Sequence, residues 1–236
     1  MTRKKNAVDF FSDETLICHS KDFEVVEAYK TIRTNIMYSM PKTNGGKMLV
    51  LTSPTAGDGK TTTSINLALT FAQVNARVLL MDCDLRKPKI HRHLKLERKD
   101  GVSNILCGFT DVEQAIKVGV RENLDVITSG EVPPNPPELL QSEKYENLIN
   151  YLKTKYDYII VDTPPISLVT DATSPIKLSN GTVLVTRMGY TTTDALDVAI
   201  DRLEKIDAKI IGTIMIDNKE NNHVTSYKKY KYGYKD

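Results

Sequence analysis

The stretch that decides the fold is Ser53-Pro-Thr-Ala-Gly-Asp-Gly-Lys-Thr61. An apolar run at 48–52 precedes it, and a helical pattern at 61–74 follows. A strand, a glycine loop and a helix in this order form a cradle for phosphate, because the loop N–H groups and the positive end of the helix face an anion. Lys60 adds a full positive charge, and Thr61 would place its hydroxyl on a magnesium ion. The sequence therefore predicts a nucleotide site formed by Ala56, Gly57, Asp58, Gly59, Lys60, Thr61 and Thr62.

One position departs from the strict form of this loop. Pro54 stands where the first glycine normally lies, whereas Gly57 and Gly59, the glycines nearest to the phosphate, are both present. A glycine–lysine loop can also arise by chance. The strand before the loop and the helix after it favour nucleotide binding over chance.

The composition is that of an ordinary globular protein. Of 236 residues, 40% are hydrophobic and 26% are charged, so we expect a folded core and not a disordered chain. The net charge of +2 argues against a dedicated nucleic-acid binder. Cys18, Cys83 and Cys107 show no paired spacing, which disfavours disulfides and zinc and fits a reducing cytoplasm. No apolar run approaches the roughly 20 residues needed to cross a bilayer.

Short apolar runs alternate with helical patterns along the chain. The predicted strands are 48–52, 77–82, 124–128, 158–162, 182–186 and 209–216. Nearly continuous apolar strands joined by long crossovers are typical of a sheet covered on both faces. The sequence thus predicts an α/β fold: a doubly wound, mainly parallel sheet flanked by helices, over residues 20–217. Residues 1–19 form an N-terminal segment, and residues 218–236 form a mobile C-terminal tail.

Three acidic residues end predicted strands. Asp82 and Asp84 are two positions apart, so in extended chain they point to the same side, and Asp162 runs into Thr163-Pro-Pro165. A strand-terminal carboxylate near a phosphate loop is suited to hold magnesium through its water shell. One such Asp alone is more often a helix cap or a turn former. Three of them after a phosphate loop favour a shared metal and catalytic site.

The tail is rich in tyrosine. Tyr227, Tyr230, Tyr232 and Tyr234 are interleaved with Lys228, Lys229, Lys231 and Lys235. Taken alone, such a segment is a basic, solvated tail that touches acidic lipid or RNA. Beside the phosphate loop and the three acidic residues, a cluster of tyrosines that accept phosphate is the better interpretation.

Together these features resemble the bacterial tyrosine kinases, or BY-kinases, of polysaccharide export operons. These kinases belong to the deviant P-loop ATPases, which also include partitioning and cell-division positioning proteins. The resemblance extends from about Glu24 to the tail. Residues 53–61 look like the family's Walker A motif, 79–88 like its Walker A′ motif and 159–165 like its Walker B motif. Residues 187–193 are similar to a segment that follows a later strand in that family.

The resemblance implies transfer of the γ-phosphoryl group of MgATP to a tyrosine hydroxyl, with ATP and Mg²⁺ as cofactors. The expected catalytic residues are Lys60, Asp82, Asp84 and Asp162, and the expected magnesium residues are Thr61, Asp84 and Asp162. Asp82 is the best candidate to accept the hydroxyl proton, but the division of roles between Asp82 and Asp84 stays open. The four tail tyrosines are the expected phosphoacceptors.

A helix is predicted over 20–40, with an apolar stripe of Phe23, Val26, Tyr29, Ile32 and Ile36. On it, Glu27, Lys30 and Arg33 resemble the family's Glu-x-x-Arg-x-x-Arg subunit-contact motif, with a lysine in place of the first arginine. Lysine lacks the planar fork of arginine. The alternative is an ordinary solvent-facing ladder of salt bridges.

The resemblance also implies partners and a location. It implies a homo-oligomeric ring, a membrane-spanning activator or chain-length adaptor, a cognate tyrosine phosphatase and no nucleic acid. The protein would be cytoplasmic, recruited to the inner face of the cell membrane by its activator, and would regulate capsular or exopolysaccharide synthesis.

Two other functions compete with the kinase. A positioning-type ATPase switch would carry a signature lysine at the place of Thr55, and this chain lacks it. A pseudoenzyme scaffold would lack catalytic residues, and none of the three acidic residues is missing. Thr55 and the tyrosine-rich tail therefore favour the kinase.

Overall fold

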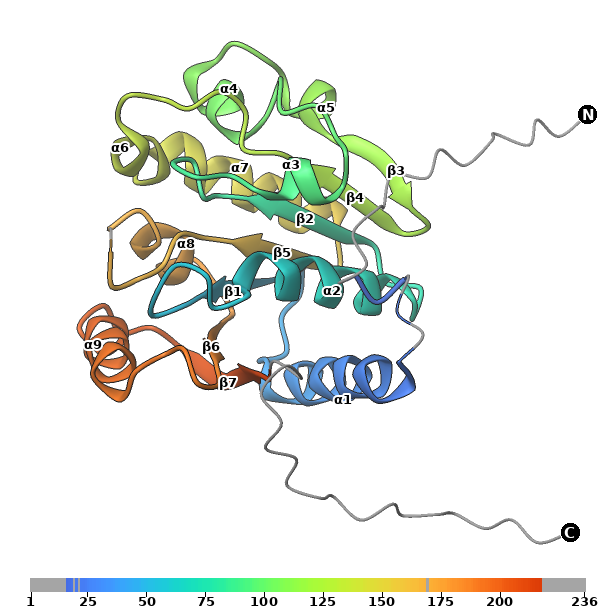
Figure 1. Cartoon of the computed structure of the whole chain (residues 1–236). Coiled ribbons are helices and arrows are strands. Elements are labelled where there is room, and N and C mark those ends of the chain that lie inside the picture. The colour runs from blue at the N-terminus through green and yellow to red at the C-terminus, as the bar shows by residue number, and fades with distance from the viewer. Residues whose placement is uncertain (1–15, 19, 21, 169, 218–236) are drawn as a thin grey trace, which may run out of the picture.

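The computed structural model describes residues 16–217 except 19, 21 and 169 (Figure 1). Its seven strands form one sheet in the order β3-β4-β2-β5-β1-β6-β7. All neighbouring strands are parallel except β3 and β4. The strands are β1 (Lys47–Thr52), β2 (Val78–Asp82), β3 (Lys117–Arg121), β4 (Leu124–Ile127), β5 (Tyr158–Asp162), β6 (Gly181–Arg187) and β7 (Ile210–Ile216).

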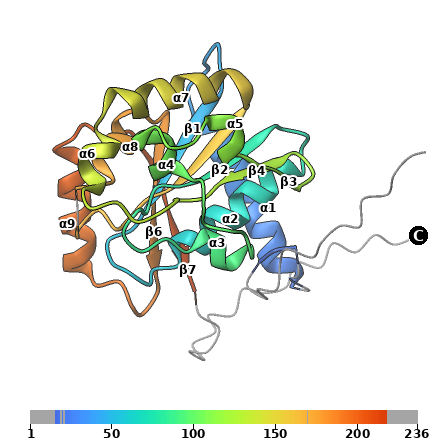
Figure 2. The same ribbon diagram turned by 90° about the horizontal axis from the view of Figure 1, so that it is seen from above.

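Helices cover both faces of this sheet, as the two views in Figures 1 and 2 show. They are α1 (Phe23–Ser39), α2 (Lys60–Ala72), α3 (Ile90–His93), α4 (Val102–Cys107), α5 (Val112–Ala115), α6 (Pro136–Leu140), α7 (Glu143–Lys155), α8 (Thr173–Lys177) and α9 (Thr193–Glu204). The predicted doubly wound, mainly parallel fold is confirmed.

The period of two along each strand sends its side chains to opposite faces. In β1, Leu49 and Leu51 join a core with α1 and α2, whereas Met48 and Val50 join a second core with α7, α8 and α9. This is why the interior strands β1, β2 and β5 are apolar along nearly their whole length: neither of their faces is left for water.

The six predicted strands are present, with ends within one residue of the prediction. The seventh, β3, was not predicted. It is an antiparallel edge strand that pairs with β4 across a tight turn, in which Asn123 takes a positive φ of 61°. Its buried residues are few, so it has no apolar run by which to recognise it.

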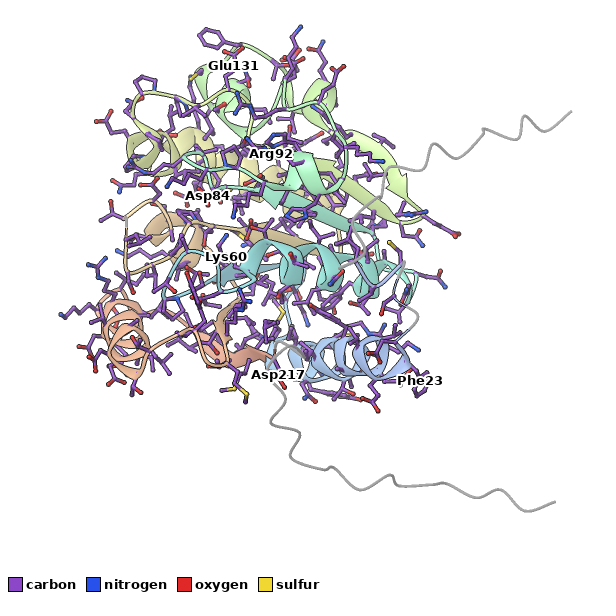
Figure 3. All side chains as sticks on the ribbon, viewed as in Figure 1. Phe23, Lys60, Asp84, Arg92, Glu131 and Asp217 are labelled. Carbon is purple, nitrogen blue, oxygen red and sulfur yellow. The ribbon has the colours of Figure 1, made fainter. Side chains whose placement is uncertain are left out.

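The first helix is real, but its predicted apolar stripe is partly wrong. Tyr29 and Ile36 are buried and Ile32 packs against the core, whereas Phe23 is 73% exposed. The helix begins at Phe23, where Asp22 caps it by accepting a bond from the Glu24 N–H. Phe23 is the first residue of α1 and lies at one end of the helix (Figure 3).

The folded core begins before position 20. Leu16 and Ile17, which the sequence assigned to a separate N-terminal segment, are buried in the core that contains α1 and α2. The Ile17 N–H donates to Asn66 Oδ1 of α2 at 3.0 Å. Among the described residues, no helix is long and apolar enough to cross a membrane.

Candidate active site

The phosphate loop lies between β1 and α2, at the carboxyl end of the interior strand β1, where parallel sheets bind their ligands. Gly57 and Gly59 both have positive φ, 96° and 87°, a conformation that costs glycine little and other residues much. Gly59 is also the N-terminal cap residue of α2, and it has no side chain that would cover the first N–H groups of the helix. Those N–H groups are therefore left for an anion.

Lys60 and Thr61 both contact Asp162, the last residue of β5. Lys60 Nζ lies 2.7 Å from Asp162 Oδ1, and Thr61 Oγ1 donates to Asp162 Oδ2 at 2.7 Å. Ser64 Oγ adds a third bond to this carboxylate at 3.2 Å. The pairing of β1 with β5 sets this geometry, because it places Asp162 beside Leu51, just before the loop. The sequence predicted Lys60, Thr61 and Asp162 at one site, and the structure brings them together.

Asp82 ends β2 and pairs with Asp162 in the strand register. It is completely buried, and its two oxygens accept bonds from the Asp84 N–H at 3.1 Å and the Ile90 N–H at 3.2 Å. Burial, followed by the negative charge of Asp162, raises the pKa of Asp82 well above its ordinary range. A carboxyl in this environment holds a proton more readily than a free aspartate does.

Asp84 faces the opening of the site. It is 8% exposed and lines the cavity beside the phosphate loop, and its Oδ1 accepts the Lys87 N–H at 3.0 Å. Burial raises the pKa of Asp84, while the charge of Lys60 opposes that rise. Asp82 and Asp84 lie in the same part of the molecule, as their i, i+2 spacing predicted. Their carboxylates differ in exposure: Asp82 is held inside the protein, and Asp84 reaches the cavity.

The cavity itself has a volume of about 410 Å³, within the usual range of small-molecule sites. Lys60 of α2 and Asp84 of the segment after β2 both line it, and both are labelled in Figure 3. Cationic residues surround the Asp84 side, and Pro164, Pro165 and Leu168 form an apolar wall. The cationic residues are Arg86, Lys87 and Lys89, and the His93 side chain lies among them in the lining. Such a cavity suits an anionic ligand with an apolar part.

The oxygen donors fit magnesium better than a transition metal. Thr61 Oγ1, the Asp162 carboxylate and the Asp84 carboxylate are hard ligands of the kind that Mg²⁺ prefers. Among the described residues, no group of three or more His, Cys, Asp or Glu side chains could hold a metal ion by itself. Mg²⁺ usually keeps waters and takes one or two carboxylates together with substrate phosphates, so a site of this kind is the expected one.

Three residues that the sequence did not single out also meet this site. Asp171 is fully buried and makes two bonds with Arg86, at 2.7 and 3.1 Å, which fixes the loop after β2 against the loop after β5. Tyr190 and Thr191 contact the phosphate loop from the segment after β6. The similarity of residues 187–193 to a family segment was a signal for the last two. No motif or spacing in the sequence pointed to Asp171.

The residues predicted to contact another subunit have partners within the chain. Lys30 Nζ lies 2.7 Å from Glu27 Oε1, and both side chains are nearly half exposed. Arg33 Nη1 donates to the Thr70 carbonyl of α2 at 2.8 Å. The four tail tyrosines lie outside the described residues.

Comparison with known proteins identifies the family. The model of a family described as an AAA domain matches residues 46–216. The tyrosine-protein kinase YwqD of Bacillus subtilis is 39% identical over 208 residues, which are 88% of this chain and 85% of YwqD.

Solved structures agree with this assignment. The chimerical protein CapA2B2 has a TM-score of 0.81 at 33% identity, over 88% of this chain and 91% of that one. The kinase domain of the Escherichia coli tyrosine kinase ETK has a TM-score of 0.78 at 33% identity, over 89% and 80%. The cell division ATPase MinD of Pyrococcus furiosus is less similar, with a TM-score of 0.61 at 28% identity over 72% and 71%. The chain has the P-loop NTPase fold and belongs to the bacterial tyrosine-protein kinases.

Proposed function

We propose that this tyrosine kinase transfers the γ-phosphoryl group of MgATP to the tail tyrosines of a neighbouring subunit, and so regulates capsular or exopolysaccharide synthesis. The observation that carries the proposal is the contact of Lys60 and Thr61 with Asp162, beside a phosphate loop with two positive-φ glycines. Phosphoryl transfer depends mainly on positioning and on neutralising charge, and these residues supply both.

Each residue of the site has a defined task in this proposal. Residues 56–62 hold the phosphates through their N–H groups, and Lys60 exchanges Asp162 for a phosphate oxygen when nucleotide binds. Asp84 and Asp162 would hold Mg²⁺ together with Thr61, directly or through water. When bound, the ion neutralises charge on the β- and γ-phosphates.

Asp82 is proposed to accept the proton of the attacking tyrosine. The tyrosine oxygen forms a bond to the γ-phosphorus, the bond from that phosphorus to the ADP oxygen breaks, and the hydroxyl proton passes to the Asp82 carboxylate. Tyrosine has an ordinary pKa of about 10, so a carboxylate can take its proton only as the bond to phosphorus forms. Because Asp82 is fully buried, the segment that follows β2 has to open for this step.

The tail is suited to act as a switch once it is modified. Each phosphate adds about −1.5 to −2 charges at neutral pH, so four would add about −6 to −8. That change overwhelms the four lysines between the tyrosines. We propose that unmodified tails support a ring of subunits and that modified tails open it.

The proposed setting follows from the family resemblance. A membrane-spanning activator or chain-length adaptor would recruit the cytoplasmic kinase to the inner face of the cell membrane through its cytoplasmic segment. A cognate tyrosine phosphatase would reset the tail.

One mixing experiment tests acceptor, catalyst and transfer between subunits together. Lys60→Met protein keeps its tail tyrosines but loses the phosphate-binding charge, and a variant with the four tail tyrosines changed to Phe keeps the site but has no acceptors. Each is incubated alone with MgATP, and then the two are mixed, with and without an activator's cytoplasmic segment. Phosphotyrosine is located by mass spectrometry.

In the mixture, we expect phosphate on Tyr227, Tyr230, Tyr232 and Tyr234 of the Lys60→Met protein. Neither variant incubated by itself should carry phosphate on these residues. Lys205→Met, which changes an exposed lysine of the C-terminal end of α9, is the matched control and should retain wild-type transfer. Tyr38, which is 87% exposed, tests whether exposure alone is enough, and it should stay unmodified. ATP hydrolysis without any phosphotyrosine, even with activator, would favour the positioning-type switch instead.

A further inference from the structure

The segment that follows β6 contacts the phosphate loop through two side chains. This segment, residues 188–192, is called the brace loop here, and it connects β6 to α9. Thr191 Oγ1 donates to Asp58 Oδ1 at 2.7 Å and accepts the Arg187 N–H at 2.8 Å. The Tyr190 hydroxyl donates to the Ala56 carbonyl at 2.9 Å. Two neighbouring side chains thus fix two nearby residues of the phosphate loop.

Asp58 is the centre of these contacts. It is 1% exposed, and its Oδ2 accepts the Thr55 N–H at 2.7 Å, which closes the phosphate loop on itself. The Thr55 hydroxyl also contacts this carboxylate, at 3.0 and 3.1 Å. Because Asp58 is buried, each donor it loses leaves charge poorly paired inside the protein. Thr191 supplies a donor from a separate part of the chain.

The brace loop fits closely against the loop it holds. A Cβ at Gly57 would lie 3.1 Å from the Tyr190 hydroxyl, so the absence of a side chain there allows the approach. On another side, a Cβ at Gly59 would lie 3.4 Å from Ile216 Cγ1 of β7. The Met188 N–H donates to the Ile216 carbonyl at 2.8 Å, which connects the brace loop to β7. The brace loop and β7 therefore both lie against the glycines of the phosphate loop.

We propose that Thr191 is a positioning residue for nucleotide binding, and that Tyr190 assists it. Thr191 acts through Asp58: it keeps the phosphate loop in the shape in which its N–H groups face the phosphates. A loop that is already ordered costs less free energy to bind, so the brace raises affinity without touching the ligand. The inference rests on the proposed function in one respect, that MgATP and MgADP are the ligands.

The adjacent residue offers a matched control. Thr192 is the N-cap of α9, where its Oγ1 accepts the Ala195 N–H at 3.2 Å. Thr192→Val removes a threonine hydroxyl one position away from Thr191, and it costs a helix cap instead of a contact with the phosphate loop. The two variants separate positioning from stability.

The test measures MgADP binding to full-length proteins by calorimetry, with ATP kinetics and melting temperature alongside. For Thr191→Val we expect Kd for MgADP and KM for ATP to rise about tenfold, which corresponds to about 1.4 kcal/mol. We expect kcat to stay within about twofold, because binding in the ground state and in the transition state weakens equally. Thr191→Ser, which keeps the hydroxyl, should restore affinity. Thr192→Val should lower Tm and leave Kd unchanged.

A double-variant cycle tests the route through Asp58. In an Asp58→Ala background, Thr191→Val should cause little further loss of affinity, because its partner is already absent. Additive losses would overturn the route through Asp58. If Thr191→Val lowers Tm but binds MgADP as the wild type does, Thr191 is only structural and the inference is wrong. If the wild-type protein itself fails to bind MgADP, the proposed function fails, and the inference fails with it.

Discussion

Helices α1 and α2 lie side by side on one face of the sheet, yet they differ sharply in burial (Figure 1). Eleven of the thirteen residues of α2 are buried, including its first residue, Lys60. Two of the seventeen residues of α1 are buried. The helix that carries the phosphate site is enclosed by protein, whereas the helix that carries the predicted subunit contacts is mostly open to water.

The comparison separates two kinds of motif. The contacts of Lys60 and Thr61 in α2 with Asp162 are made within one chain, so a single subunit contains all three groups. The motif on α1 has local partners as well: Glu27 pairs with Lys30, and Arg33 bonds to α2. A contact of those three residues with another subunit would show as a change in subunit number when they are replaced. Four experiments test this difference between the two helices.

The largest effect is expected at the end of α2 that holds the site. Asp162→Asn removes the negative charge that faces Lys60 and takes bonds from Thr61 and Ser64. We expect tail phosphorylation to fall at least about hundredfold, because catalysis at such a site is mainly electrostatic. Phosphotyrosine formation over time measures it, and light scattering should show an unchanged subunit number. Normal tail phosphorylation by Asp162→Asn would mean that the contacts of Lys60 and Thr61 in α2 with Asp162 are not needed for phosphoryl transfer.

A smaller effect is expected where the two helices meet. Arg33→Ala removes the bond to the Thr70 carbonyl and should cost about 1 kcal/mol, since the donor is charged and half-buried. A protein of this size should then lose about 2–4 °C in Tm. Calorimetric melting and light scattering are measured on the same samples. A fall in subunit number without a change in Tm would assign Arg33 to subunit contact and not to the joint between α1 and α2.

The pH dependence of stability tests the buried acid beside α2. The folded state raises the pKa of Asp82 above its ordinary 3.8, so the folded protein binds this proton more tightly than the unfolded chain does. Stability must therefore decrease as pH rises from about that value through the raised pKa. In nucleotide-free protein with EDTA, Asp82→Asn should reduce the difference in Tm between roughly pH 5 and pH 8. An unchanged difference would contradict the environment described for Asp82.

The smallest effect is expected on the exposed side of α1. Lys30→Ala breaks the i, i+3 pair with Glu27, in which the side chains are 43% and 45% exposed. Such pairs on a helix surface contribute about 0.3–0.5 kcal/mol and often nothing measurable, so Tm should change by less than about 2 °C. The subunit number is the informative measurement here. A reduced number at unchanged Tm would support the subunit-contact motif on α1.

Most of the site was predictable because its signals are local. The phosphate loop, the strand before it and the helix after it are consecutive in the chain, so residues 56–62 could be assigned from spacing alone. Asp84 and Asp162 could be placed nearby because parallel strands put their carboxyl ends at the same edge of a sheet. What spacing did not show was the contrast between Asp82 and Asp84, which depends on the turn that brings the Ile90 N–H to Asp82.

The residues that were missed have partners far away in sequence. Arg86 and Asp171 are 85 residues apart, and Thr191 and Asp58 are 133 residues apart. No periodicity or local motif connects such pairs. The error at Phe23 has a related cause: a helical stripe shows which residues can face a core, but not how far that core extends along the helix.

Six of the seven strands, the first helix, the sheet covered on both faces, the phosphate loop and the carboxylates at strand ends could be read from the sequence alone. These depend on short-range backbone preferences and on the alternation of apolar residues, which a single chain displays directly. The tertiary structure decided which carboxylate reaches the cavity, which cation pairs with which acid, and that the loop after β6 braces the phosphate loop. Those outcomes depend on the burial of charges and on contacts between distant segments, and both are set by how the crossovers pack against the sheet.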